Sequence, residues 1–300
     1  MTILFSNEIL SAVKNELSNA SNSIQIITAY CKRQTIELLD SYIQEGVNNK
    51  RLLVRFRLDD IVKGSTDYSI LDFGLEKGWK VYIRFDLHAK TYVVDELRGI
   101  VGSANATGSG LGVGTAANME MATLVNIEKE DVIKINNMFV DAIEVDDNVR
   151  TLLDKQFETV DLTKKSNNLS WDKGITDLFK PTVGTLFSHE FPDSDIIQSN
   201  TYIPFLDYFY DGDIEDLKRT LRWSRCYLWL RNTLAESGGE LYFGAITERL
   251  HNSLVSDPKP YRKDVKILLS SLLGIIDKLQ MDDIVIDRPN YSQRVRLKNN

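Results

Sequence analysis

The chain has 300 residues, of which 43% are hydrophobic and 26% are charged. This composition is typical of a globular protein with room for two domains, and it excludes a long disordered chain, a collagen-like repeat and a disulfide scaffold. The apolar runs are too short to span a bilayer, the first residues lack the pattern of a signal peptide, and only two cysteines occur. We therefore expect a cytoplasmic protein without a membrane segment.

The formal net charge of −7 is distributed unevenly along the chain. Residues 201–300 contain 15 basic and 14 acidic residues, so the negative excess lies in the first 200 residues. A polyanion would therefore have to bind through local basic patches, more readily in the last third of the chain.

The first 145 residues alternate between helix and strand patterns. Apolar residues at helical spacing predict a helix capped by Ser6, a second at 36–43, a short third at 70–73 and a fourth at 132–143. Runs rich in β-branched residues predict strands at 24–30, 52–56, 81–85, 91–94, 98–101 and 119–125. This alternation predicts an α/β fold in which helices flank a mixed β-sheet.

The composition changes after residue 160. We interpret residues 161–200, which include the polar run Lys164–Asn168, as a linker in which Trp171, Phe179 and Phe187 pack on a domain. The predicted organisation is thus a first domain at 1–160, the linker at 161–200 and a second domain at 201–300.

The second domain is predicted to be mainly helical. Its helices are expected at 214–234, 241–254 and 265–279, and short strands at 284–286 and 294–297 flank the turn 288–291. Helix, helix and hairpin is the order of a winged-helix DNA-binding domain.

One segment of the first domain carries a chemical pattern, His-x-Lys-x4-Asp-x6-Gly-Ser-x-Asn. It consists of His88, Lys90, Asp95, Gly102, Ser103 and Asn105. Residues two apart on a strand point the same way, so His88 and Lys90 can converge on one phosphate, as can Ser103 and Asn105. A neutral imidazole is a nucleophile and its cation is an acid. The side chains of Lys90, Ser103 and Asn105 can bind phosphoryl oxygens.

This pattern resembles the signature of the phospholipase D superfamily, whose members cleave phosphodiesters in lipids or nucleic acids. The resemblance covers about residues 5–145 and implies a phospholipase D-like fold. It also implies that Asp95 and Gly102 are structural, that Asn118 and Glu120 occupy positions where the family often has Asn and Glu, and that Glu120 orients a histidine. A lone histidine on a strand is usually structural, but here five positions match at fixed spacing.

The family mechanism uses two such motifs. One histidine attacks phosphorus and forms a phosphohistidine, while the other protonates the leaving oxygen and then activates water. Neither His189 nor His251 has a lysine two residues later, so the chain holds one half-site. The resemblance to single-motif nucleases and metal-independent restriction endonucleases therefore implies a homodimer in which two copies of His88 share one site.

No metal or other cofactor is expected. The acidic pairs Asp59-Asp60 and Asp282-Asp283 lack the histidine or cysteine partners of a hydrolytic metal site, and we interpret them as solvated turns. No phosphate-binding loop for ATP occurs in the sequence.

The likeness to the family alone does not choose between lipid and nucleic acid. Lipid-processing relatives usually carry two motifs and often a membrane-directing segment, whereas the basic residues of this chain favour DNA. The predicted DNA-binding residues are Lys259, Arg262, Lys263, Lys266, Arg288, Arg294 and Arg296. The alternative is a helical dimerisation or partner-docking domain with solvated charges.

The sequence thus predicts a metal-independent, homodimeric DNA endonuclease of the restriction or phage-defence type. His88 would be nucleophile and acid, Glu120 would orient it, and the phosphate would bind Lys90, Ser103 and Asn105. A helicase or methyltransferase partner could license cleavage. Two alternatives stay open: a winged-helix regulatory protein that uses its first domain as a dimerisation scaffold, and a phospholipid phosphodiesterase.

Overall fold

A computed structural model of the chain describes residues 2–113, 116–160, 169–289 and 291–298. The chain divides into two compact units, Met1–Lys180 and Pro181–Asn300. The division falls within 161–200, the segment interpreted as a linker, and the polar run at 164–168 lies outside the described residues. Trp171 and Phe179 are buried in the first unit, whereas Phe187 of the second unit is exposed. Within the described ranges, every helix is too short or too polar to cross a bilayer.

Among the described residues of the first unit, eight strands form one mixed sheet, which confirms the predicted α/β fold class. Their order is β1-β7-β6-β5-β2-β3-β4-β8, and only the pairs β2–β3 and β3–β4 are parallel. The strands are β1 (Thr2–Phe5), β2 (Ser23–Thr28), β3 (Asn49–Arg55), β4 (Trp79–Arg84), β5 (Lys90–Val94), β6 (Arg98–Gly102), β7 (Met121–Asn126) and β8 (Ile143–Glu144).

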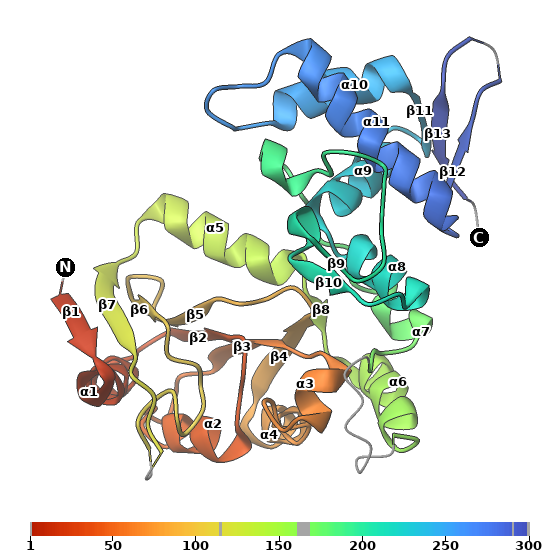
Figure 1. The fold of residues 1–300 in the computed structure, drawn as a ribbon. Helices are drawn as coiled ribbons and strands as arrows, with labels where there is room; N and C mark the ends of the chain where they lie inside the picture. The colour runs from red at the N-terminus through yellow and green to blue at the C-terminus, as the bar shows by residue number, and fades with distance from the viewer. Residues whose placement is uncertain (1, 114–115, 161–168, 290, 299–300) are drawn as a thin grey trace. The chain divides into compact units, whose positions relative to one another are not determined.

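Helices cover both faces of this sheet. They are α1 (Ser6–Ser18), α2 (Arg33–Asp40), α3 (Leu58–Val62), α4 (Ile70–Lys77), α5 (Lys129–Val140), α6 (Asp147–Phe157) and α7 (Lys173–Thr176). Figure 1 shows α5 on one face and α1, α2 and α4 on the other. Ile9, Val13 and Leu17 of α1 recur every four residues and are fully buried, so the predicted apolar stripe is the one that packs on the sheet.

Ser6 is the first residue of α1 and not its cap, which differs from the prediction. Its hydroxyl oxygen accepts a hydrogen bond from the Glu120 backbone N–H at 2.7 Å and donates to the Glu120 carbonyl at 3.3 Å. The Ser6 hydroxyl thus bonds to the backbone of Glu120, and not to a backbone N–H of the first turn of α1 as a helix cap would. Ser6 therefore fixes the residue that immediately precedes β7.

The strand ends of the first unit meet at one edge of the sheet. Strands β2, β3, β4 and β6 end there, whereas β5 and β7 begin there, because Thr28 pairs with Lys90, Arg55 with Arg84 and Gly102 with Ala122. We call this the motif edge and define it as residues 28–31, 55–57, 84–90, 102–106 and 118–121. It gathers five segments that are far apart in the sequence.

Lys90 is the first residue of β5, and Asp95 directly follows the last one. Asp95 and Glu96 have φ of 54° and 56°, as the two central residues of a type I′ turn require. The Asp95 carboxylate accepts hydrogen bonds from the backbone N–H groups of Ser21, Asn22 and Ser23 at 2.9, 2.7 and 2.8 Å. Burial alone would raise the pKa of Asp95, but these donors bring it below its usual value. The carboxylate thereby ties the β5–β6 turn to the start of β2.

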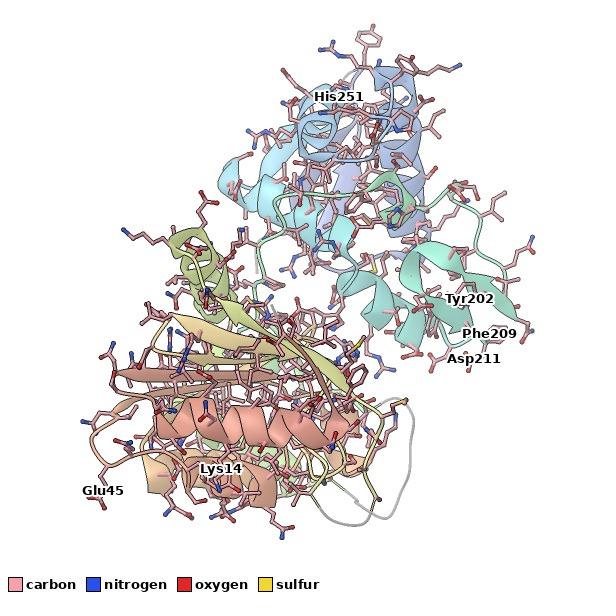
Figure 2. The ribbon with its side chains drawn as sticks, turned by 90° about the vertical axis from the view of Figure 1, so that its left-hand side faces the viewer. Lys14, Glu45, Tyr202, Phe209, Asp211 and His251 are labelled. Atoms are coloured by element: carbon pink, nitrogen blue, oxygen red, sulfur yellow. The ribbon has the colours of Figure 1, made fainter. Side chains whose placement is uncertain are left out.

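The second unit contains helices and two small antiparallel sheets among its described residues. Its elements are β9 (Thr201–Ile203), β10 (Tyr208–Tyr210), α8 (Ile214–Arg222), α9 (Arg225–Glu236), β11 (Glu240–Tyr242), α10 (Phe243–Ser253), α11 (Arg262–Leu279), β12 (Ile284–Asp287) and β13 (Arg294–Leu297). One sheet has the order β11-β13-β12 and the other is the hairpin β9–β10. Tyr202 and Phe209 form a cross-strand pair that projects from this hairpin (Figure 2).

Two predicted helices of the second unit are wrong in detail. The helix expected over 214–234 is interrupted between α8 and α9, where the Ser224 hydroxyl donates to the Leu221 carbonyl at 2.7 Å and competes with the helical bond. The helix expected from residue 241 starts at Phe243, because Leu241 pairs with Val295 in a sheet. The predicted hairpin corresponds to β12 and β13, and Asn290 of its turn lies outside the described residues.

Replacing Asp95 with alanine is expected to lower the free energy of unfolding by about 2 kcal/mol at pH 7, because three charge-assisted backbone bonds are lost. The lowered pKa means that this contribution is present above the unfolded-state pKa of about 4 and is lost as the pH falls through the folded-state pKa. Urea unfolding at pH 7 and in acid measures both. Asp95→Asn keeps one acceptor and should lose less, and a constant difference between wild type and Asp95→Ala at all pH values would contradict this account.

Candidate active site

His88 and Lys90 stand in the middle of the motif edge. Strand β5 begins at Lys90, so His88 lies in the β4–β5 connection, where its side chain is exposed. Lys90 is only 9% exposed, and its ammonium group donates to the His88 carbonyl oxygen at 2.6 Å. Burial, followed by the positive charge of Arg55, lowers the pKa of Lys90, while the Glu120 carboxylate acts in the opposite direction. A buried ammonium and an exposed imidazole are therefore neighbours at the motif edge.

Ser103 and Glu120 are joined across the ends of β6 and β7. The Ser103 hydroxyl donates to one Glu120 carboxylate oxygen and accepts a bond from the Met121 backbone N–H at 3.1 Å. The Asn118 side-chain amide donates to the other carboxylate oxygen at 3.1 Å. Glu120 is buried and forms no hydrogen bond with His88 in the described part of this chain. Its role in orienting a histidine therefore stays a prediction.

Two glycines allow the backbone to approach closely around these residues. A Cβ atom at Gly102 would overlap the Met121 carbonyl and the Ala122 side chain, so only glycine fits where β6 meets β7. A Cβ atom at Gly110 would lie 2.5 Å from the Asn105 carbonyl oxygen. The glycine-rich loop can therefore pack directly against the backbone of Asn105.

Asn105 is held with its amide nitrogen available. Its side-chain oxygen accepts hydrogen bonds from the Tyr30 backbone N–H at 3.0 Å and from the Thr28 hydroxyl at 3.3 Å. Thr28 pairs with Lys90 in the sheet, so Asn105 and Lys90 approach the same residue. Among the described residues the Asn105 amide nitrogen has no protein partner, and it can donate to a bound oxygen.

Arg55 and Arg57 also belong to the motif edge, although the sequence reasoning did not identify them. Arg55 donates to both carboxylate oxygens of Asp60 at 2.7 and 2.9 Å and to the Tyr30 hydroxyl at 2.6 Å. Arg57 donates through Nε to the Phe85 carbonyl. The available signal was an Arg-Phe-Arg sequence directly after a buried strand, since ligands of α/β sheets often bind beyond the carboxyl ends of parallel strands.

The expectation that Asp60 lies in a solvated turn is wrong. Its carboxylate is buried and paired with Arg55, because Asp60 lies in α3, which begins three residues after the end of β3. Asp283 likewise accepts a hydrogen bond from the Tyr227 hydroxyl and pairs with Arg231 at 3.1 Å. In the described ranges, no three His, Cys, Asp or Glu side chains gather as a metal-binding group.

The surroundings of His88 favour its neutral form. Partial burial of the imidazole lowers the pKa of His88, and the positive charges of Lys90, Arg55 and Arg57 lower it further, whereas Asp60 opposes them. The imidazole is therefore largely unprotonated at neutral pH, which is the form that can attack an electrophile.

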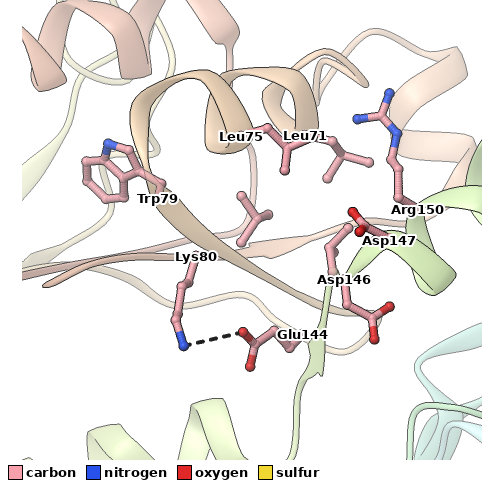
Figure 3. A pocket seen from close by; sticks show the side chains of 10 residues that line it. Leu71, Leu75, Trp79, Lys80, Glu144, Asp146, Asp147 and Arg150 are labelled. Atoms are coloured by element: carbon pink, nitrogen blue, oxygen red, sulfur yellow. Dashed lines mark ion pairs between the residues drawn. The ribbon is translucent and has the colours of Figure 1, made fainter. Parts of the chain in front are cut away.

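A pocket of about 340 Å³ adjoins His88. It is lined by residues of the β4–β5 connection and of α5, namely Arg84, Asp86, Leu87, His88, Ala89, Lys134, Asn137, Met138 and Asp141. A second pocket of about 120 Å³ lies between α4, the start of β4 and residues 144–150 (Figure 3). Lys80 and Glu144 form a 3.6 Å ion pair there, and none of the motif residues lines this second pocket.

The predicted DNA-binding residues of the second unit fall into two groups. Five are exposed without an ion pair among the described residues: Lys259 before α11, Arg262, Lys263 and Lys266 in its first turns, and Arg288 after β12. Arg294 instead pairs with Asp287 at 2.9 Å and Glu240 at 3.4 Å, and Arg296 pairs with Asp287 at 3.5 Å. The exposed positive charge is therefore concentrated at the start of α11.

Comparison with known proteins gives one match to a family model. Residues 13–143 match the model described as "Cardiolipin synthase, PLD-like domain", and this range includes every residue of the motif. A search of curated proteins gave no match.

Similar solved structures cover about half of this chain. Nuc, a phospholipase D family member from Salmonella typhimurium, is 16% identical with a TM-score of 0.38, over 48% of this chain and 96% of its own. NucT from Helicobacter pylori is 14% identical with a TM-score of 0.36, over 48% and 98%. Phosphatidylserine synthase from Haemophilus influenzae is 14% identical with a TM-score of 0.36, over 52% and 45%.

Replacing Lys90 with methionine is expected to raise the pKa of His88, because it removes one of the positive charges that disfavour the imidazolium. NMR titration of the histidine Cε1–H signals measures this shift, and His189→Gln and His251→Gln assign the other two histidines. Lys80→Met removes a distant charge and should leave the His88 midpoint unchanged. An unchanged midpoint in Lys90→Met would show that the two groups do not interact.

Proposed function

We propose that this chain, whose residues 13–143 form a phospholipase D-like domain, is a metal-independent phosphodiesterase that cleaves DNA as a homodimer. The proposal places it among nucleases of the restriction or phage-defence type, and it includes a helicase or methyltransferase as a partner that licenses cleavage. The observation that carries the proposal is the motif edge, where a neutral, exposed imidazole stands beside a buried ammonium group and an available amide donor.

These groups match the needs of nucleophilic attack on a phosphodiester. In the first step an imidazole nitrogen of His88 forms a bond to phosphorus and the bond to the leaving alkoxide breaks. His88 of the second copy must first take up a proton against its lowered pKa, and it then donates that proton to the leaving oxygen. In the second step water attacks phosphorus, the P–N bond breaks, and the second imidazole takes the proton of the water. Lys90 and Asn105 would stabilise the negative charge on the phosphoryl oxygens, and Ser103 would do so once its hydroxyl proton turns from Glu120 to the phosphate.

An uncovered apolar surface beside the motif supports the homodimer. Ile3 and Val101 both pair with Thr123 in the sheet, and Phe5 pairs with Met121, so these side chains share one face of β6, β7 and β1. The four apolar side chains are between 42% and 59% exposed. Met121 directly follows Glu120, and Val101 lies two residues before Ser103. A second copy bound to this surface could therefore bring its His88 to the same site.

The element order of the second unit supports DNA binding. Helix α9, strand β11, helices α10 and α11, and strands β12 and β13 follow the helix, helix and hairpin order of winged-helix domains. The long helix α11 buries Val265 and Leu269 and exposes cations at its first turns, as a helix that enters the major groove requires.

Cleavage is expected to survive excess EDTA and to be lost in His88→Ala. Imidazole and ammonium groups supply the nucleophile, acid and charge stabilisation, so rates on plasmid and single-stranded DNA should fall on the order of 10³-fold or more in the variant. His189→Ala removes an exposed histidine of the second unit and should cleave like the wild type. Acid-labile, base-stable label on the protein after a quench with ³²P-labelled DNA would identify the phosphohistidine. EDTA-sensitive cutting that persists in His88→Ala would contradict the mechanism.

Subunit mixing provides a second readout of the same prediction. If both copies of His88 are needed, only dimers of two wild-type chains are active. Activity should then follow the square of the wild-type fraction when wild type and His88→Ala are co-refolded at constant total concentration. A linear dependence would mean that each chain acts alone.

Removing Lys263 and Lys266 together is expected to weaken DNA binding about tenfold or more and to make the slope of log K against log salt shallower by about 2. Fluorescence anisotropy with a His88→Ala background measures binding without cleavage. Lys278→Ala is the matched control, because it removes a lysine at the far end of α11, where it pairs with Asp195. Equal affinities and slopes in both variants would favour the alternative of a docking domain with solvated charges.

A further inference from the structure

We propose that Arg57 binds a second phosphate of the substrate, the one next to the scissile phosphate, so that the substrate class is a polynucleotide. This inference rests on the proposed phosphodiesterase function and names the substrate feature that the same site selects. Its basis is the placement of a guanidinium group with unpaired Nη donors, among the described residues, at the motif edge and outside the phospholipase D-like motif.

The arginines flank a residue that faces inward. Phe56 is fully buried, its ring stacks on Trp171 with centroids 5.9 Å apart, and its carbonyl accepts a bond from the Trp171 indole at 2.5 Å. Because alternate residues of an extended segment point to opposite sides, Arg55 and Arg57 are directed away from the core that holds Phe56. Trp171 thus fixes the backbone between them.

Arg55 forms more hydrogen bonds within the protein than Arg57 does. The Arg55 guanidinium donates hydrogen bonds to the Asp60 carboxylate and the Tyr30 hydroxyl. The carboxylates whose charges act on Arg57 are each paired with another cation: Asp59 with Lys63 at 3.2 Å, Asp60 with Arg55 at 2.7 Å and Asp86 with Arg84 at 2.9 Å. Arg57 is exposed and donates only Nε, to Phe85, among the described residues. Its remaining N–H groups are free for a ligand.

The position of Arg57 suits a phosphate beside the scissile one. Phe85, which holds the Arg57 Nε, precedes His88 by three residues, a span of at most about 10 Å. The positive charge of Arg57 also contributes to the lowered pKa of His88, so the guanidinium acts on the same region of space as the imidazole. A planar guanidinium binds phosphate oxygens in pairs, which a lysine cannot do.

A second phosphate is what separates a polynucleotide from a simple diester. The scissile phosphate already has Lys90, Ser103 and Asn105 as donors in the proposed site. A substrate with one phosphate leaves Arg57 without a ligand, whereas a nucleic-acid strand places another phosphate one nucleotide away. The arginine therefore contributes binding energy only for a chain of phosphates.

The test compares two substrates with Arg57→Ala, Arg57→Lys and wild type, all as full-length protein. The substrates are bis(p-nitrophenyl) phosphate and a fluorescently labelled single-stranded 12-nucleotide DNA. We expect Arg57→Ala to lose at least tenfold more kcat/KM on the oligonucleotide than on the small diester, mainly through KM. The slope of log kcat/KM against log salt should become shallower by about 0.7, the value for one phosphate contact on a single strand. Arg57→Lys should keep that slope and recover part of the affinity.

Controls separate the failure of this inference from the failure of the proposed function. Lys80→Ala removes a positive charge at the distant pocket and should behave as wild type on both substrates. Equal losses on both substrates in Arg57→Ala would overturn the second-phosphate contact while leaving the phosphodiesterase intact. If the wild type cleaves neither substrate, phosphodiesterase activity of the chain without a licensing partner is ruled out, and the anisotropy of the oligonucleotide with wild type and Arg57→Ala still decides the contact. Hydrolysis of cardiolipin vesicles with the same dependence on Arg57 would assign the second phosphate to a lipid and overturn the polynucleotide.

Discussion

The buried ammonium group of Lys90 is the constraint on which the site depends. A cation removed from water needs partners, and Lys90 finds them in the His88 carbonyl and in the charge of Glu120. Glu120 is itself held by the Ser103 hydroxyl and the Asn118 amide, and its backbone is held by Ser6. The need to compensate one charge therefore links the start of α1, the end of β6, the segment before β7 and the start of β5.

The same edge concentrates positive charge in a protein whose formal charge is −7. His88, Lys90, Arg55 and Arg57 lie together, and Asp60 is the nearby carboxylate that opposes the lowering of the His88 pKa. The overall charge would repel a polyanion at long range, but salt screens that repulsion beyond about 10 Å and leaves the local field to act on contact. Burial is the first cause of the lowered pKa of His88, and the field that draws an anionic phosphate lowers it further.

The motif and the strands beside it could be predicted from the sequence because both are local, although His88 lies in the β4–β5 connection and not on a strand as expected. The spacing from His88 to Asn105 and the β-branched runs are visible within about twenty residues, and the strands formed within a few residues of their expected limits. Arg55 and Arg57 could not be placed in the same way, because their approach to His88 depends on the pairing of β3 with β4. The partners of Ser6 and the burial of Asp60 were missed for the same reason, since each depends on residues that only the fold brings near.

The strand order gives the motif edge two unlike flanks. On one side of β5 lie β6, β7 and β1, with an exposed apolar face. On the other side lie β2 and β3, whose ends are followed by Tyr30 and Arg57. In the proposed dimer a second copy covers the apolar flank and buries its apolar surface away from water. The cationic flank stays open to an anionic strand. The His88 of the second copy would then approach the scissile bond from the apolar flank, and the neighbouring phosphate would bind on the cationic flank. A site with one motif can in this way acquire its missing acid without losing the surface that selects its substrate.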